Sequence, residues 1–146
     1  MIRPASLGDV KECVQLTVEF FKPFLEKHGI DVILQDVYNV AVASISSNQV
    51  LVVEHDKKIC GLTAWAIIRH PANSKVRIFY ETIWCVKSED KTDVLLLLRA
   101  LENEAVKSKA DMLVIANLNT DTEEQLKRIP KQVFSRGIML DQMGVK

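Results

Sequence analysis

One stretch of the chain, Val76–Val86, is apolar on both sides of a strand. The residues at even positions are apolar or uncharged, and Phe79, Ile83 and Cys85 make the odd positions apolar as well, with Glu81 among them. A strand that is apolar on both faces lies inside a sheet rather than at its edge. The pattern therefore predicts a central strand at Val76–Val86.

An amphipathic helix is predicted directly after this strand. A polar turn, Lys87–Lys91, follows it, and a second apolar strand is predicted at Met112–Leu118. Between them, apolar residues recur at the spacing of one helix face: Val94, Leu97, Leu98, Leu101 and Ala105. Strand, helix and strand in this order predict a right-handed βαβ unit with parallel strands.

The start of this helix is the first place to look for function. In a βαβ unit, ligands bind beyond the carboxyl end of the strand, at the N-terminus of the helix. The free N–H groups and the helix dipole favour anions there. The stretch 86–94 is therefore the expected ligand-binding segment.

The N-terminal third predicts a strand and two helices. Ile2–Ala5 reads as a short strand, and Ser6–Asp9 has the pattern of a capping box. In the helix that follows, Pro23 is expected to bend or end it near Lys22. The expected inward face of that helix comprises Val10, Cys13, Val14, Thr17, Phe20, Phe21 and Phe24. A second helix is predicted from about Gln35 to Ser47, with Val37, Ala41, Ser44 and Ile45 inward.

The remaining segments complete a mixed sheet. Val50–Glu54 and Ile59–Arg69 are separated by a short polar turn, which predicts an antiparallel hairpin. After Leu118, a capping pattern opens another helix to about Ile129, and Ile138–Leu140 begins a final strand. The predicted order is β-α-α-β-β-β-α-β-α-β, an α/β (α+β) fold in a single domain, residues 1–146.

Composition narrows the class of protein. The chain has 146 residues, of which 48% are hydrophobic and 26% charged, as expected of one globular domain. Its 19 basic and 19 acidic side chains give a net charge of zero, so nothing draws it toward nucleic acid or an anionic membrane. Without an apolar run of membrane-spanning length or a signal-peptide core, the expectation is a cytoplasmic protein.

The cysteines and histidines do not have the spacing of a metal site. Cys13, Cys60 and Cys85 are odd in number and widely separated, and the three histidines are scattered along the chain. Free thiols in a reducing compartment are therefore expected, with neither a disulfide nor a bound metal.

Several stretches resemble the GNAT family of N-acyltransferases, in the same order and over nearly the whole chain. Met1–Asp9 is similar to the family's opening, and Gly61 stands where many members have a strand glycine. Ala100–Ala105 is similar to the middle of their third helix, and Phe134–Ile138 to their C-terminal aromatic–Gly–aromatic motif. The resemblance implies a GNAT-like mixed central sheet in which a parallel pair of strands flanks the βαβ helix.

The resemblance also implies a site for acetyl-CoA. In the family, a Gln/Arg-x-x-Gly-x-Gly/Ala loop after the fourth strand binds the pyrophosphate of acetyl-CoA. This chain can be aligned with that motif in two ways, and neither places a glycine at the glycine positions. One alignment places Lys91 at the basic position with Val94 and Leu96 at the glycines, and the other places Glu89 there with Thr92 and Val94. The implied cofactor-binding residues are Trp84, Cys85, Val86, Lys91, Thr92, Asp93, Val94 and Asn117.

Glu81 is the candidate general base. Family members often use a carboxylate on the fourth or fifth strand, and burial between Phe79 and Ile83 could raise the pKa of Glu81 toward working pH. The alternative is that Glu81 pairs with Arg69 or Arg77 on the neighbouring strand. The tyrosine that many members use as an acid has no counterpart at Val133 or Phe134.

Two functional hypotheses follow. The first is an acetyl-CoA-dependent N-acetyltransferase that acts on an amine acceptor the sequence does not identify. The second is a non-catalytic GNAT-like module that binds protein or forms a homo-oligomer, for example as a phage protein within a viral particle. The resemblance to the family over nearly the whole chain favours the first hypothesis. The missing glycines and the missing phenol favour the second.

Overall fold

The computed structural model describes residues 1–87 and 90–116. Within these ranges the elements, in chain order, are β1 (Ile2–Pro4), a single 3-10 turn (Leu7–Asp9), α1 (Val10–Lys27), α2 (Leu34–Ser46), β2 (Val50–His55), β3 (Lys58–His70), β4 (Asn73–Val86), α3 (Lys91–Lys107) and β5 (Met112–Val114). The helix and strand predicted after Leu118 lie outside the described residues, as do Glu89 and Asn117.

The described strands form one mixed sheet in the order β1-β2-β3-β4-β5. The pairs from β1 to β4 are antiparallel, and β4 pairs with β5 in parallel, from Ile78 opposite Met112 to Tyr80 opposite Val114. β4 therefore lies between two strands, which confirms the interior position predicted from its two apolar faces. The predicted hairpin and βαβ unit are also confirmed.

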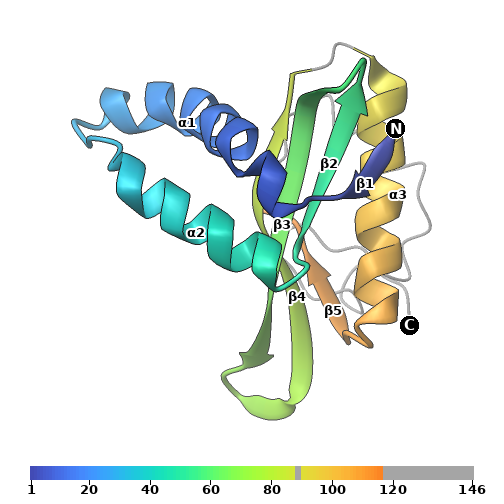
Figure 1. Ribbon diagram of the computed structural model, residues 1–146. Helices are drawn as coiled ribbons and strands as arrows, with labels where there is room; N and C mark the ends of the chain where they lie inside the picture. The colour runs from blue at the N-terminus through green and yellow to red at the C-terminus, as the bar shows by residue number, and fades with distance from the viewer. Residues whose placement is uncertain (88–89, 117–146) are drawn as a thin grey trace.

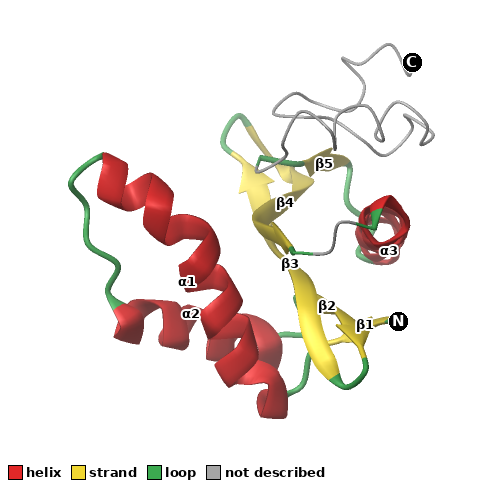
Figure 2. Cartoon of the chain, turned by 90° about the horizontal axis from the view of Figure 1, so that it is seen from above, coloured by secondary structure: helices red, strands yellow, loops and turns green. Residues whose placement is uncertain are grey.

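Helices cover both faces of the sheet. Figure 1 shows α1 and α2 on one face and α3 on the other, and Figure 2 shows the same layers from above. One core cluster joins the sheet to α3 through residues such as Phe79, Trp84 and Leu98. A second joins it to α1 and α2, with Cys13, Ile45 and other buried residues. None of the helices in the described ranges is long and apolar enough to cross a membrane.

Of the two effects predicted for Pro23, bending or ending the first helix near Lys22, the second is wrong. α1 continues through Pro23 to Lys27 and ends with Gly29 at a φ of 69°. There the Ile30 amide donates to the Leu25 carbonyl, which is a glycine cap of the Schellman type. Proline removes only one helical hydrogen bond, and the Glu19 carbonyl that loses it belongs to an exposed residue, where water can replace the bond.

The inward face predicted for α1 is correct only for its first half. Cys13, Val14 and Thr17 are buried, but Phe20 is 44% and Phe24 61% exposed. The predicted helical spacing of these residues is correct, but the second half of α1 projects beyond the sheet, as Figure 2 shows. In α2 the predicted inward residues are buried or half-buried, so that prediction is confirmed.

Candidate functional site

The pairing of β4 changes on both of its edges near Thr82. Toward β5, the described parallel ladder ends at Tyr80 and Val114. Toward β3, Ile83 lies opposite Ala64 and Glu81 lies opposite Trp65, so Thr82 is one extra residue in β4. Such a β-bulge bends a strand and redirects its side chains, and bulges are common beside active sites.

Glu81 lies at this bulge and is fully buried. Its Oε2 accepts a hydrogen bond from the backbone amide of Ala116 at 2.8 Å. The carboxylate thus links β4 to the chain just beyond β5, where the main-chain ladder has stopped. In register Glu81 is opposite Trp65, whereas Arg69 is opposite Arg77.

The carboxyl end of β4 offers backbone groups more than side chains. Trp84 is 4% and Cys85 2% exposed, each in a core cluster, and Val86 is half-buried. Burial, and then the nearby charge of Glu81, raises the pKa of Cys85 to about 12. The Cys85 thiol is therefore held in its neutral, unreactive form.

The direction of the β4 amides follows from one hydrogen bond. The Lys87 amide donates to the carbonyl of Cys60 in β3 at 2.8 Å. Because successive residues of a strand point their amides to opposite edges, those of Val86 and Trp84 point away from β3. They face the edge along which the described part of β5 is no longer paired.

The first turn of α3 already carries carboxylates. Asp90 is the N-cap, and its side chain accepts from the Thr92 amide at 2.8 Å. Lys91 and Thr92 are exposed, Val94 is half-buried, and Asp93 is buried. Asp90 therefore occupies one of the amides that would bind a phosphate at this helix start.

Asp93 has a partner that sequence reasoning missed. Its Oδ2 lies 2.8 Å from Nε2 of His55, the last residue of β2. Cys60 of β3 completes a group in which the three ligand-type atoms all lie within 4.8 Å of one another. His55 and Cys60 belong to one hairpin, but Asp93 comes from α3, and a spacing pattern of cysteines and histidines does not include it.

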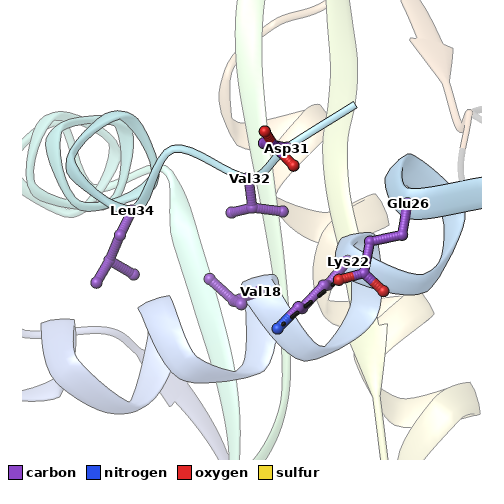
Figure 3. A pocket seen from close by; sticks show the side chains of 6 residues that line it. All are labelled: Val18, Lys22, Glu26, Asp31, Val32 and Leu34. Atoms are coloured by element: carbon purple, nitrogen blue, oxygen red, sulfur yellow. Dashed lines mark ion pairs between the residues drawn. The ribbon is translucent and has the colours of Figure 1, made fainter. Parts of the chain in front are cut away.

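In the described part of the chain, hollows lie beside α1 and α2. One, of about 370 Å³, lies between α1 and the segment leading to α2, where Lys22 and Glu26 form an ion pair at 3.8 Å (Figure 3). The other, of about 220 Å³, is lined by Thr17, Asp36, Val37, Val40, Ala41 and Ile83. Ile83 brings the second hollow to the face of the sheet that α1 and α2 cover, whereas Glu81 lies opposite Trp65, which packs in the cluster with α3.

Comparison with solved structures identifies the fold. No family model and no curated protein matches the chain. A predicted acetyltransferase with acetyl-CoA from Clostridium acetobutylicum matches with a TM-score of 0.67 and 20% identity, over 88% of this chain and 86% of that one. A ribosomal-protein-alanine N-acetyltransferase from Brucella melitensis biovar Abortus 2308 matches with a TM-score of 0.61 and 15% identity, over 94% and 93%. An integron cassette protein from the mobile metagenome of Cole Harbour Salt Marsh matches with a TM-score of 0.69 and 13% identity, over 95% and 90%.

These likenesses show that the chain has the GNAT fold, with the mixed sheet and the parallel β4–β5 pair that the sequence predicted. The low identities mark it as a divergent example of that fold. Because one fold serves several functions, activity must be argued from the site.

Proposed function

We propose that this protein is an acyl-CoA-dependent N-acyltransferase that transfers an acetyl group to an amine. The proposal depends chiefly on the edge of β4 from Glu81 to Val86. There, two backbone amides and one buried carboxylate face the edge along which the described β4–β5 ladder has ended. That a structural neighbour was solved with acetyl-CoA is a property of that neighbour, and it supports the proposal only through the shared fold.

The residues at this edge fit the thioester arm of acetyl-CoA better than its pyrophosphate. The Val86 and Trp84 amides can donate to an extended acyl-pantetheine chain as a strand would. At the phosphate end, Asp90 already uses the Thr92 amide, and the cations available are the exposed Lys91 and Lys87, which pairs with Glu19. We therefore expect weaker binding than a glycine-rich loop would give.

In the proposed reaction the amine attacks the thioester carbonyl directly, so a C–N bond forms and the C–S bond breaks. A β4 amide donating to the carbonyl oxygen stabilises the charge that develops there. Glu81, directly or through water, accepts the proton lost by the amine. The departing thiolate takes a proton from water, because the sequence has no phenol at Val133 or Phe134.

For the acceptor amine we propose the hollow lined by Thr17, Asp36, Val37, Val40, Ala41 and Ile83. It is largely apolar and contains a single carboxylate, Asp36, which would attract an ammonium group. Ile83 is the residue of β4 that lines this hollow, with the bulge residue Thr82 between it and Glu81. The identity of the acceptor is not part of the proposal.

Calorimetric titration with acetyl-CoA and with CoA tests the proposal. We expect binding of both ligands to the wild-type protein and to Glu81→Gln, because the side-chain amide of the variant keeps an acceptor oxygen for the Ala116 amide. Acetyl transfer to a panel of amines should fall by about 10²-fold or more in Glu81→Gln. Glu104→Gln on α3 is the matched control and should keep both properties. Absence of binding at millimolar acetyl-CoA would rule out the proposal.

A second candidate function is a non-catalytic binding module, and it too rests on a specific observation. Asp90 satisfies the Thr92 amide, and Glu81 satisfies that of Ala116, so groups that a cofactor would use are already bonded. In this case the protein would act by self-association or within a larger assembly such as a viral particle. Failure to bind acetyl-CoA together with a stable homo-oligomer in light scattering would favour it.

A further inference from the structure

A β-bulge places Cys60 on the α3 side of the sheet. Val53 is opposite Gly61 and Glu54 is opposite Ile59, so Cys60 is the extra residue of β3. Its side chain packs against the core cluster that includes α3, and its Sγ lies 3.5 Å from the Val53 carbonyl. A cysteine at a bulge can point where regular alternation would not direct it.

The tip of the same hairpin places His55. Asp56 and Lys57 both have positive φ, 49° and 63°, which is the backbone of a tight type I′ turn. This turn ends β2 at His55, whose imidazole meets Asp93 in the first turn of α3. The His55 side chain is 51% exposed and that of Asp93 only 7%, so the pair has one side open to solvent.

We infer that His55, Cys60 and Asp93 form a Zn²⁺ site with one coordination position open to water. Imidazole nitrogen, thiolate and carboxylate are the ligands that zinc uses, and three protein ligands plus water is the arrangement of an open site. Tetrahedral bonds to zinc place ligand atoms about 3.3 to 3.6 Å apart. Since the three atoms already lie within 4.8 Å of one another, side-chain movements of about 1 Å complete the site.

The charges around the site favour a dication. When Cys60 is a thiolate, it and the Asp93 carboxylate supply two negative charges, which Zn²⁺ neutralises. The N-terminal ammonium of Met1, which donates a hydrogen bond to the Glu54 carbonyl at 2.9 Å, is a positive charge that opposes this. The half-exposed imidazole gives the metal an entry path.

This inference goes beyond acyl transfer and does not require it. The three ligands come from the β2–β3 hairpin and the first turn of α3, and none of them is Glu81 or a β4 residue. Asp93 is also one of the implied cofactor-binding residues, but metal binding is measured in the absence of CoA. The two ideas can therefore fail separately.

Cobalt titration of the full chain, after treatment with a chelator, tests the inference. Co²⁺ replaces Zn²⁺ and produces a near-ultraviolet charge-transfer band only when a thiolate is bound. We expect one Co²⁺ per chain, displacement of that Co²⁺ by Zn²⁺, and no band in Cys60→Ser. His55→Gln should bind Co²⁺ at least about tenfold more weakly, since even the loss of a group that merely orients a ligand costs that much.

His28→Gln is the matched control, because His28 is an exposed histidine at the end of α1. It should bind Co²⁺ like the wild type. His55→Gln lies at a solvent-exposed turn, so its fold, checked by circular dichroism, should be intact. The inference is overturned if the wild type gives no band, if the band persists in Cys60→Ser, or if His55→Gln binds as tightly as His28→Gln.

Discussion

At the scale of single residues, Asp9 ties the first strand to the first helix. Arg3 donates to both of its carboxylate oxygens, at 2.8 and 3.0 Å, and the Ser6 amide donates at 2.7 Å. These bonds, chiefly those from Arg3, lower the pKa of Asp9 from its ordinary 3.8 to about 2. The ionised carboxylate is therefore favoured in the folded state.

This shift predicts an acid-dependent loss of stability. Because the folded pKa lies below the unfolded one, the contribution is complete above pH 4 and disappears as the pH falls from about 4 to about 2. The pH-dependent contribution of Asp9 to the free energy of unfolding amounts to at most about 2 kcal/mol. Urea unfolding should show Asp9→Asn losing stability relative to the wild type at neutral pH, with a difference that narrows toward pH 2. Asp31→Asn, at an exposed position, should show no such narrowing; a constant Asp9 difference would contradict the prediction.

At the scale of elements, α1 shows how a proline can be carried inside a helix. Pro23→Ala restores an amide that can donate to the Glu19 carbonyl and removes the clash of the proline ring. We expect it to raise the free energy of unfolding by roughly 1 to 2 kcal/mol, less than the full helical cost of proline because proline also restrains the unfolded chain. Urea unfolding measures this. Lys22→Ala, an exposed change in the same turn, should alter stability by under about 0.5 kcal/mol, and a loss of stability in Pro23→Ala would contradict the prediction.

The elements that the sequence predicted well are those whose hydrophobic period is unambiguous. β4 reads as a buried strand because both faces are apolar, and the positions from Val94 to Ala105 repeat at the helical period. The predicted alternative that α1 ends near Lys22 is wrong, because one proline does not outweigh an amphipathic pattern that continues beyond it. The exposure of Phe24 could not be predicted, because it depends on where the sheet ends beneath the helix.

The candidate site was predictable only in part. Glu81 stands out in the sequence as a carboxylate within an apolar strand, and in the structure it is buried near the end of the described β4–β5 pairing. Its role as a base stays a prediction. The grouping of His55 and Cys60 with Asp93 depends on a bulge and on the packing of α3 over the hairpin, neither of which has a sequence pattern.

At the scale of the whole molecule, stability should be distributed unevenly between the helices that cover the sheet. In α3, the side chains of Asp93, Leu97, Leu98, Leu101 and Ala105 are all buried, whereas in α2 only Ile45 is. Segments with little buried surface open at lower free energy than those that are well packed. α2, which supplies four of the residues that line the proposed acceptor hollow, is thus the more weakly held helix.

Native-state hydrogen exchange, followed by mass spectrometry, measures this difference. We expect the free energy of opening measured at α2 amides to be at least about 1 kcal/mol lower than that at α3 amides. α3 is a helix of comparable length and serves as the internal reference. Amides of β3 and β4 should exchange most slowly. Equal protection of α2 and α3 would contradict the prediction.

The order of the strands has a consequence for synthesis. Because the sheet order β1-β2-β3-β4-β5 is also the order in the chain, each new strand emerging from the ribosome finds its partner already made. Two strands pair only after intervening helices have been made: β2 pairs with β1 after α1 and α2, and β5 pairs with β4 after α3. The Ala116 amide that reaches Glu81 comes later still, so the proposed active site is completed after the scaffold that supports it has formed.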